Sequence, residues 1–244
     1  MAIKERRTKI LLSLLLLSDV VKSYPIPLDD KVQKTFDYSL NQKTKGSLSG
    51  LVKEELITRI DDKYELTDKG FAELCLGFPF FRFLREKWDG KWRILSYEIP
   101  EKKRELRDKL RREVVGWGLG PWHRSFWLTP HPIIENLRQL VSQKEEEKYI
   151  QAFESDHVFG DRTVLIEKVW AKTQLDKKYR EMFKKWHDVL ASSREKLEKF
   201  QEVVNEYVIL LRQDPGLPKE LLGESWIGFE ALNIFKEIKS ILLS

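Results

Sequence analysis

The chain has 244 residues, of which 41% are hydrophobic and 34% charged, so it is long enough for one or two domains with packed cores. Its net charge of +5 is compatible with a polyanionic partner and equally with Lys-rich, solvated helix faces. Cys75 is the only cysteine, which excludes an intramolecular disulfide and fits a reducing, cytoplasmic compartment. One cysteine and four histidines give no zinc-ligand spacing, so we expect neither a metal nor a cofactor.

The first predicted element is a helix over residues 4–22, built on the apolar run Ile10–Leu17. Basic residues precede this run as they do in a signal peptide. The run is too short to span a bilayer, however, and no small-residue cleavage site follows it. We therefore expect a buried first helix of a cytoplasmic domain and no membrane partner.

Residues 1–76 are predicted to form one small unit. A second helix is predicted within 28–40, after the breaks at Pro25 and Pro27. A third helix is predicted from about Ser47 to Glu55, with an inner face of Leu48, Leu51, Val52 and Leu56. Extended runs at 57–60 and 63–66 follow around a turn at Asp61-Asp62, and then a short helix capped by Thr67.

Three helices followed by a two-stranded hairpin are the layout of a winged helix-turn-helix, and the run Leu48–Leu74 resembles winged-helix transcriptional regulators. Such a unit reads DNA with the N-terminal residues of its third helix in the major groove. Lysine supplies charge for phosphates, while Gln, Ser and Thr donate to phosphates or bases. The predicted DNA-binding residues are Gln42, Lys43, Thr44, Lys45, Ser47, Ser49, Lys53, Lys63 and Tyr64.

The net charge of this unit limits how it could bind DNA. Residues 1–70 carry 13 Lys/Arg and 11 Asp/Glu, so they are nearly neutral. DNA affinity therefore requires the charges to segregate, or a dimer to double the contacts. The alternative is a winged helix used for protein contacts.

Residues 77–160 are predicted to be a connector and a ferredoxin-like central domain. The connector, 77–87, carries four phenylalanines that we expect to pack against neighbouring elements. The first element after it is a strand at 92–97. A helix then follows Pro100; its apolar stripe is Leu106, Leu110 and Val114, and the helix ends at Gly116, Gly118 and Gly120. The last elements are a strand at 125–128, a helix after Pro132, and a strand at 148–154. This alternation predicts an α+β sandwich with a ferredoxin-like sheet.

The helix after Pro100 carries Lys and Arg interleaved with Glu and Asp. Opposite charges at i, i+3 and i+4 favour a solvated helix over a nucleic-acid-binding stripe.

Residues 161–244 are predicted to form a helical C-terminal domain. A long amphipathic stretch from 173 to 212 breaks near 191–193, and Asp214–Pro218 is a helix stop and turn. A last helical region runs over 221–243 and is interrupted around Gly228. The predicted fold class is thus α+β, with a winged helix, a ferredoxin-like centre and a helical C-terminal region.

Motifs in three separate regions of the chain resemble those of PaaX-type transcriptional repressors and occur in the same order. One region is the winged helix, and the other two are central and C-terminal. The central motifs are Trp-Asp-Gly-Lys-Trp-Arg at 88–93, Glu98-Ile99-Pro100-Glu101, Arg104, Arg107, Leu110-Arg111, Gly118-Leu119-Gly120, and Phe126-Trp127-Leu128 with Pro130. The C-terminal motifs are Asp214-Pro215-Gly216-Leu217-Pro218, Leu221-Leu222, Trp226, and Gly228 with Ala231.

The resemblance implies a dimeric repressor whose central domain is similar to the small ferredoxin-like CRISPR-associated nuclease. It also implies release of DNA by an effector, which in the namesake family is an aryl-acetyl coenzyme A thioester. The sequence itself has no phosphate-cradling glycine motif. The predicted partners are a double-stranded DNA operator, a second copy in a homodimer, and a small-molecule effector such as an acyl coenzyme A thioester.

A metal-dependent nuclease is the main alternative. Related nucleases place an Asp at the end of the first strand as a metal ligand, and here Glu98 stands there. Glutamate can bind Mg²⁺, but a carboxylate near a helix start also has a structural reason to be there. His123 and His131 are candidate general bases, although a histidine beside Trp or Pro is more often packed or on the surface. We expect no catalytic residue, and a protein–protein adaptor built on helices 173–243 is a third hypothesis.

Overall fold

The computed structural model describes residues 6–243, which divide into two compact units. Unit 1 contains the described residues up to Gly77 together with Asp176–Gln213 and the chain from Ser225 onward. Unit 2 contains Phe78–Leu175 and Asp214–Glu224. The chain therefore leaves unit 1 and returns to it twice. The three-part division of the sequence at 76 and 160 stays a prediction.

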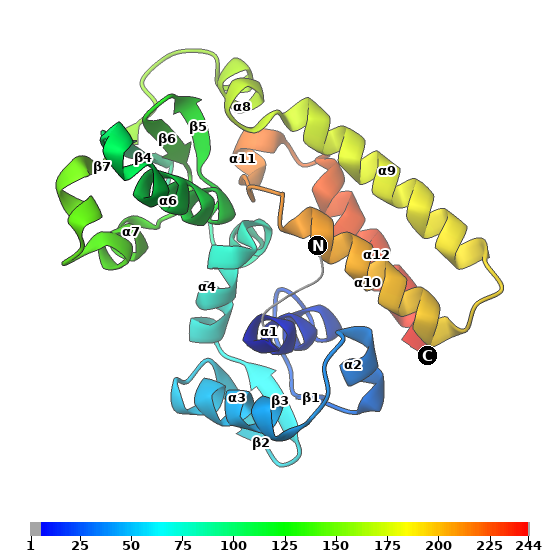
Figure 1. Cartoon of the computed structure of the whole chain (residues 1–244). Coiled ribbons are helices and arrows are strands. Elements are labelled where there is room, and N and C mark those ends of the chain that lie inside the picture. Colours follow the sequence, from blue (N-terminus) through cyan, green and yellow to red (C-terminus); the bar gives the residue numbers. More distant parts are fainter. Residues whose placement is uncertain (1–5, 244) are drawn as a thin grey trace. The chain divides into compact units, whose positions relative to one another are not determined.

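The N-terminal part of unit 1 has four helices and a small antiparallel sheet of strand order β1-β3-β2 (Figure 1). Its elements are α1 (Arg6–Leu17), β1 (Ile26–Pro27), α2 (Asp30–Thr35), α3 (Gln42–Lys53), β2 (Ile57–Ile60), β3 (Lys63–Leu66) and α4 (Asp68–Gly77). The hairpin lies where it was predicted. Thr67 caps α4 as expected, because its hydroxyl accepts a hydrogen bond from the backbone N–H of Gly70.

Helix α1 is buried along Ile10–Leu17, as the sequence predicts. The helix ends five residues earlier than expected because Asp19 accepts hydrogen bonds from the backbone N–H groups of Val21 and Lys22, which folds 19–22 into a turn. Positions 4 and 5 of the predicted helix lie outside the described residues. No helix in the described part of the chain is long and apolar enough to cross a membrane.

The C-terminal part of unit 1 consists of most of α9 (Lys172–Ala191), α10 (Lys196–Leu211) and α12 (Ile227–Leu243), which run side by side in Figure 1. Aromatic rings from all three form the core, with Trp186–Tyr207 centroids 5.5 Å apart and Tyr207–Phe235 centroids 5.0 Å apart. The predicted break near 191–193 is confirmed. The last interruption lies at 223–226, and Gly228 is inside α12.

Lys239 of α12 joins the two parts of unit 1. Its Nζ lies 3.2 Å, 3.1 Å and 2.8 Å from the carbonyl oxygens of Leu16, Leu17 and Ser18, so it caps the C-terminus of α1. An ammonium group at this position satisfies carbonyls that have no partner within the helix and opposes the helix dipole. Partial burial lowers the pKa of Lys239.

Unit 2 has a four-stranded antiparallel sheet of strand order β5-β6-β4-β7. Its strands and the helical segments between them are, in chain order, β4 (Lys91–Tyr97), the 3₁₀ turn η2 (Glu101–Lys103), α6 (Arg104–Gly116), β5 (Gly120–His123), β6 (Phe126–Thr129), α7 (Ile134–Val141), the 3₁₀ turn η3 (Glu145–Tyr149) and β7 (Ile150–Asp156). The order βαββαβ is that of a ferredoxin-like fold, as predicted. The sequence prediction missed β5, because Gly120 and Pro121 are poor strand formers.

The two faces of this sheet have different coverings. On one face, Trp127 donates a hydrogen bond to the Tyr97 hydroxyl, and Arg111 of α6 lies over the Trp127 ring. On the other face, Trp92 and Leu128 pack against Val169 of α8 (Arg162–Trp170). The remaining elements of unit 2 are η1 (Pro79–Phe81), α5 (Arg82–Arg85) and α11 (Lys219–Leu222).

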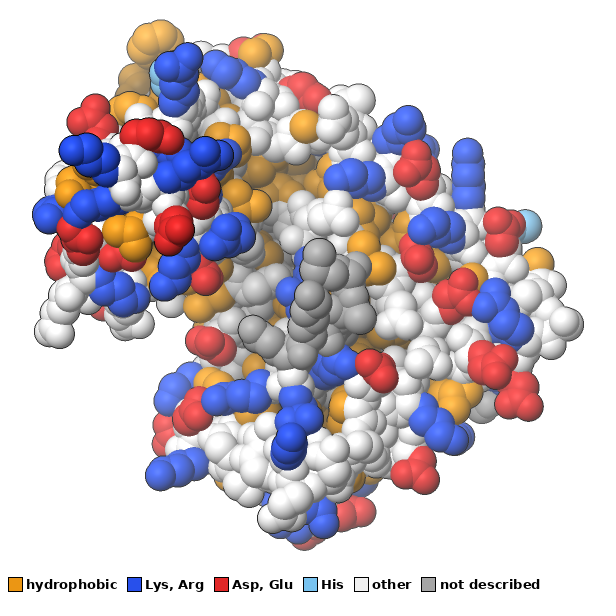
Figure 2. Space-filling view, in the orientation of Figure 1, with side chains coloured by type: hydrophobic (Ala, Val, Ile, Leu, Met, Phe, Trp, Pro, Cys, Tyr) orange, Lys and Arg blue, Asp and Glu red, His pale blue; other side chains and the backbone are white. Residues whose placement is uncertain are grey.

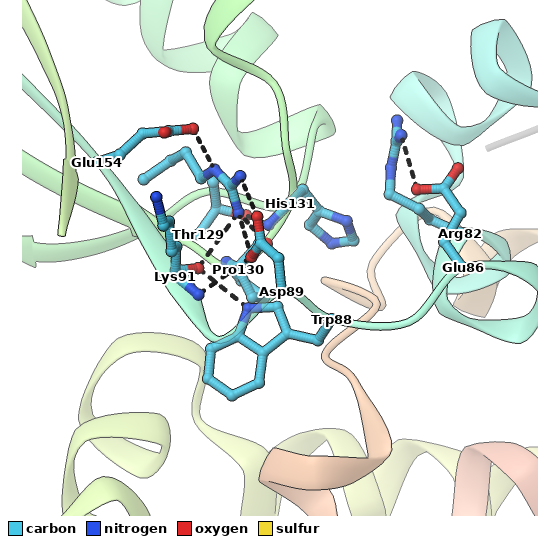
Figure 3. A network of polar contacts seen from close by, with 10 residues as sticks. Arg82, Glu86, Trp88, Asp89, Lys91, Thr129, Pro130, His131 and Glu154 are labelled. Atoms are coloured by element: carbon cyan, nitrogen blue, oxygen red, sulfur yellow. Dashed lines mark hydrogen bonds and ion pairs between the residues drawn. The ribbon is translucent and has the colours of Figure 1, made fainter. Parts of the chain in front are cut away.

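Arg93 explains much of the Trp-Asp-Gly-Lys-Trp-Arg motif, and its partners Asp89, Pro130 and Glu154 are labelled in Figure 3. Its guanidinium is buried, and its nitrogens lie 2.5 Å from an Asp89 carboxylate oxygen and 3.0 Å from Glu154. It also donates to the Pro130 carbonyl at 3.2 Å. The hydrogen bond from Arg93 lowers the pKa of Asp89. One side chain thus ties the loop before β4 to β7 and to the end of β6.

The segment Asp214–Pro218 lies in unit 2 and is irregular, and α10 ends before it, as the predicted helix stop requires. Gly216 has a φ of +65° and lies so close to Pro79 that an added Cβ would be 2.2 Å from a backbone carbon. The imidazole Nε2 of His131 lies 2.7 Å from the Pro215 carbonyl oxygen, and the ring stacks on Phe83. Burial lowers the pKa of His131 to about 3.

We expect Lys239→Met to lower the free energy of unfolding by about 2 kcal/mol, because three carbonyls at the end of α1 lose their donor while the side-chain length is kept. Urea denaturation followed by circular dichroism measures this change. Lys236→Met is the control, because its Nζ lies 3.7 Å from Asp19 at the surface and such pairs contribute less than about 1 kcal/mol. Equal effects of the two substitutions would contradict the capping role.

His131 should make unfolding depend on pH. Its folded-state pKa is below the unfolded value, so its contribution is complete above pH 6.5 and is lost as the pH falls toward 3. Relative to His131→Gln, which keeps a donor for Pro215, the unfolding free energy of the unsubstituted protein should fall by about 2 kcal/mol from pH 7.5 to pH 5. His123→Gln controls for the loss of an exposed histidine. A constant difference between the two pH values would contradict this prediction.

Candidate nucleic-acid interface

Helix α3 starts at Gln42, five residues before the predicted start. The Asn41 side chain caps it by accepting a hydrogen bond from the backbone N–H of Thr44 at 3.0 Å. Gly46 is unfavourable in a helix, which is why the sequence prediction placed the start after it. The predicted site residues from 42 to 49 therefore all lie on one helix, whose first turn has no acidic residue.

The predicted basic residues are at the surface. Lys43, Lys45, Lys53 and Lys63 are all exposed. Among the residues that the structure describes, none of their ammonium groups forms an ion pair with a carboxylate. By contrast, Arg7 pairs with Glu54, Lys9 with Asp37, and Lys69 with Glu55. The charges of this nearly neutral part of the chain thus segregate.

The polar residues of α3 differ in what they can offer to a ligand. Thr44 is fully buried, and its hydroxyl donates to the Ser39 carbonyl at 2.6 Å, so it supports the helix start from inside. The Ser47 and Ser49 hydroxyls each donate to the carbonyl four residues earlier at 3.1 Å, and both keep oxygen lone pairs. Gln42 is exposed at the first helical position.

A groove of about 660 Å³ separates α3 from the hairpin, and its lining includes Lys45, Ser49, Lys53, Arg59 and Tyr64. The sequence reasoning missed Arg59, because nothing local to β2 shows that this strand runs beside α3. Its Nε donates to the Asp61 carbonyl at 2.9 Å, which holds the guanidinium over the hairpin. Lys and Arg side chains lie on the surface of this part of the chain in Figure 2.

The tip of the hairpin is acidic. Asp61 and Asp62 are both exposed there, and Asp61 has a φ of +55°, a conformation that Asp tolerates better than most residues. The positive charges therefore lie on α3 and on the hairpin strands rather than at the tip. An anionic ligand is favoured along α3 and the groove.

A polar pocket of about 760 Å³ adjoins the start of α3 within unit 1. Its lining includes the basic residues Arg6, Lys9 and Lys34, together with Asn41, the cap of α3, and acidic residues from the start of α10. Lys9 is already paired with Asp37 at 2.7 Å. A ligand in this pocket would touch both the cap of α3 and α10.

The residues considered for catalysis differ in their surroundings. Glu98 is exposed beyond the end of β4, and its backbone N–H donates to the Tyr149 carbonyl at 2.9 Å. His123 is exposed on β5, while His131 is enclosed at the Pro215 turn. Within residues 6–243, no group of three or more His, Cys, Asp or Glu could hold a metal ion.

The basic residues of α6 also differ from those of α3. Arg104 lies within ion-pair distance of Asp108, and Arg107 lies 2.7 Å from Glu101, as expected for a solvated helix with interleaved charges. These two arginines are therefore partly neutralised within the segment, whereas Lys109 and Arg112 are exposed and have no carboxylate partner among the described residues.

Comparisons with known proteins identify the central and C-terminal parts of the chain. The family model of the PaaX protein central Cas2-like domain matches residues 85–165, and that of the PaaX-like protein C-terminal domain matches residues 170–244. No curated protein matches the chain. Among solved structures, the uncharacterized protein Rv0674 from Mycobacterium tuberculosis is similar at 17% identity and a TM-score of 0.48, covering 96% of this chain and 97% of that chain. The two family models together span more than half of the sequence and indicate a transcriptional regulator, so the chain belongs to the PaaX family.

Proposed function

We propose that the chain is a cytoplasmic repressor that binds double-stranded DNA, and that α1–α4 with β1–β3 form a winged helix in which α3 is the recognition helix. The order of helices followed by an antiparallel hairpin supports this assignment. The family domains elsewhere in the chain support a role in transcription.

The observation that carries the proposal is the segregation of charge. Lys43, Lys45, Lys53 and Arg59 have no carboxylate partner among the described residues, although the surrounding unit is nearly neutral. DNA neutralises such cations with phosphates and releases condensed counterions, which is the main source of affinity. The N-terminus of α3 adds the positive end of a helix dipole at the same place.

In this proposal the start of α3 enters the major groove, where Gln42, Lys43 and Lys45 face base edges and phosphates. Ser47 lies one helical turn after Lys43, and Ser49 lies one turn after Lys45, so each serine can accept hydrogen bonds beside one of the lysines. Thr44 supports the helix from inside. The backbone contacts come from Lys53, Arg59, Lys63 and Tyr64. The acidic tip keeps the end of the hairpin away from phosphates.

We further propose that two copies bind as a C₂ dimer. A symmetric dimer doubles the phosphate contacts of a weakly charged unit and places two recognition helices on a pseudo-palindromic operator.

We expect Lys43→Ala with Lys45→Ala to weaken binding to the DNA upstream of the chain's own gene. Each lost phosphate contact lowers the slope of log K against log[salt] by about 0.9, so the slope should fall by about 2 per protomer. Fluorescence anisotropy over a salt series measures the slope.

Lys102→Ala with Lys109→Ala is the matched control, because it removes the same charge from η2 and α6. A slope that changes only in the control would move the interface to the central domain. Absence of salt-sensitive binding by the unsubstituted protein would refute the proposal itself. The nuclease alternative is tested by incubating the protein and DNA with Mg²⁺. Recovery of intact DNA would show binding without cleavage.

The proposal includes release of the DNA by a small-molecule effector such as an acyl coenzyme A thioester. The polar pocket beside Asn41 supports this part, since Arg6 and Lys34 in its lining suit phosphates and it touches the cap of α3. Titration of an aryl-acetyl coenzyme A thioester into the DNA complex should lower the anisotropy, while free coenzyme A is the control. An unchanged signal would remove this effector class but leave DNA binding in place.

A further inference from the structure

We propose that unit 2 binds a small, uncharged aromatic molecule carrying a hydrogen-bond acceptor, in a pocket between the sheet and the loop that follows β7. The pocket has a volume of about 400 Å³, which is within the range of small-molecule sites. Trp92 and Ile94 of β4, Leu128 of β6, Trp122 of β5 and Leu165 of α8 contribute to its lining. The rest of the lining is the segment from Ser155 to Asp161, and Figure 1 shows the loop that connects β7 with α8.

The floor of this pocket is apolar and aromatic. Trp92 and Leu128 are buried, with exposed fractions of 3% and 4%, and they pack against Val169. The Trp92 ring stacks on Trp170 with centroids 5.9 Å apart, and the Trp122 side chain at the wall is 44% exposed. Flat, apolar surfaces of this kind suit a planar ring.

Trp92 also supplies the polar feature that points to a ligand. Its indole Nε1 is buried and has no hydrogen-bond acceptor among the described residues. Buried donors are almost always paired, so one without a partner on a residue that lines a pocket requires an explanation. We infer that the edge of the Trp92 ring moves toward the pocket when a molecule binds, so that a carbonyl or ether oxygen accepts this hydrogen bond.

The charges around the pocket exclude an anion. The described residues that line it include Asp156 and Asp161 but no Lys or Arg, and the lining has one histidine, His157. Asp161 is held in place as the cap of α8, since it accepts hydrogen bonds from the backbone N–H groups of Thr163 and Val164. A carboxylate or phosphate in this pocket would face these acids without a lysine or arginine beside it.

The loop over the pocket exposes two large apolar side chains. Val158 is 87% exposed and Phe159 is 90% exposed, while Gly160 has a φ of +113°, which few other residues adopt. Figure 2 shows hydrophobic side chains at the outer surface of this unit. We infer that Phe159 folds onto the ligand, which removes its apolar surface from water.

The test uses the full-length protein without DNA, and acetophenone as the probe, in saturation-transfer NMR and calorimetry. Acetophenone should bind saturably. α-Methylstyrene has the same shape without the acceptor and should bind about tenfold more weakly. Benzoate carries a negative charge and should not bind measurably.

Two substitutions locate the site. Trp92→Phe keeps an aromatic ring but removes the donor, so it should lower acetophenone affinity about tenfold and leave α-methylstyrene unchanged. Phe159→Ser changes a solvent-exposed side chain, so the protein should remain folded and bind both probes more weakly. Phe153→Ala is the matched control, because Phe153 is half exposed on the same sheet face beside Ile94 but does not line the pocket.

Absence of acetophenone binding at millimolar concentration would overturn the proposal, as would tighter binding of benzoate. Equal affinities for the unsubstituted protein and Phe159→Ser would also overturn it, even if Trp92→Phe failed to fold. Because no DNA is present, failure of the DNA-binding proposal would not alter any of these outcomes.

Discussion

The central constraint in unit 1 is the apolar run Ile10–Leu17, whose residues are buried around the whole circumference of α1. One helix with apolar residues on every side needs a covering on every side, and α3, α4 and β3 contact α1 from its own part of the chain. The end of α1 is capped by Lys239, more than two hundred residues later. The elements proposed to bind DNA are therefore positioned by a helix that the C-terminal helices help to hold.

Polar interactions in the two units have different roles. In unit 2, Arg93 is buried, and its guanidinium donates hydrogen bonds to Asp89, Glu154 and the Pro130 carbonyl. Its positive charge is therefore paired within the fold. On α3, Lys43 and Lys45 are exposed and have no carboxylate partner in the described part of the chain. A paired, buried charge fixes a structure, whereas an unpaired, exposed one is available to a partner. This difference separates the lysines of α3 from Arg93 of unit 2.

The sequence predicted elements that depend on local chemistry and missed those that depend on distant partners. The hairpin over 57–66 and the cap at Thr67 were predicted closely, since turn and capping preferences act over a few residues. The start of α3 was predicted too late, because Gly46 is unfavourable in a helix and the prediction did not recognise Asn41 as the cap. Strand β5 exists because Gly120 pairs with Leu128 in β6, and Arg59 joins the groove only through tertiary packing. Burial of Thr44 and the return of α12 to α1 are likewise invisible to periodicity.

The chain order of unit 1 has a consequence for how the protein is made. Its first helix emerges from the ribosome more than two hundred residues before Lys239 and the rest of α12. Until then, a strongly apolar segment lacks part of its covering and is exposed to chaperones and to aggregation. A nascent or prematurely terminated chain could therefore contain α3 intact in sequence and still lack a stably folded unit 1. Synthesis of α12 would then decide when the proposed DNA-binding surface becomes functional.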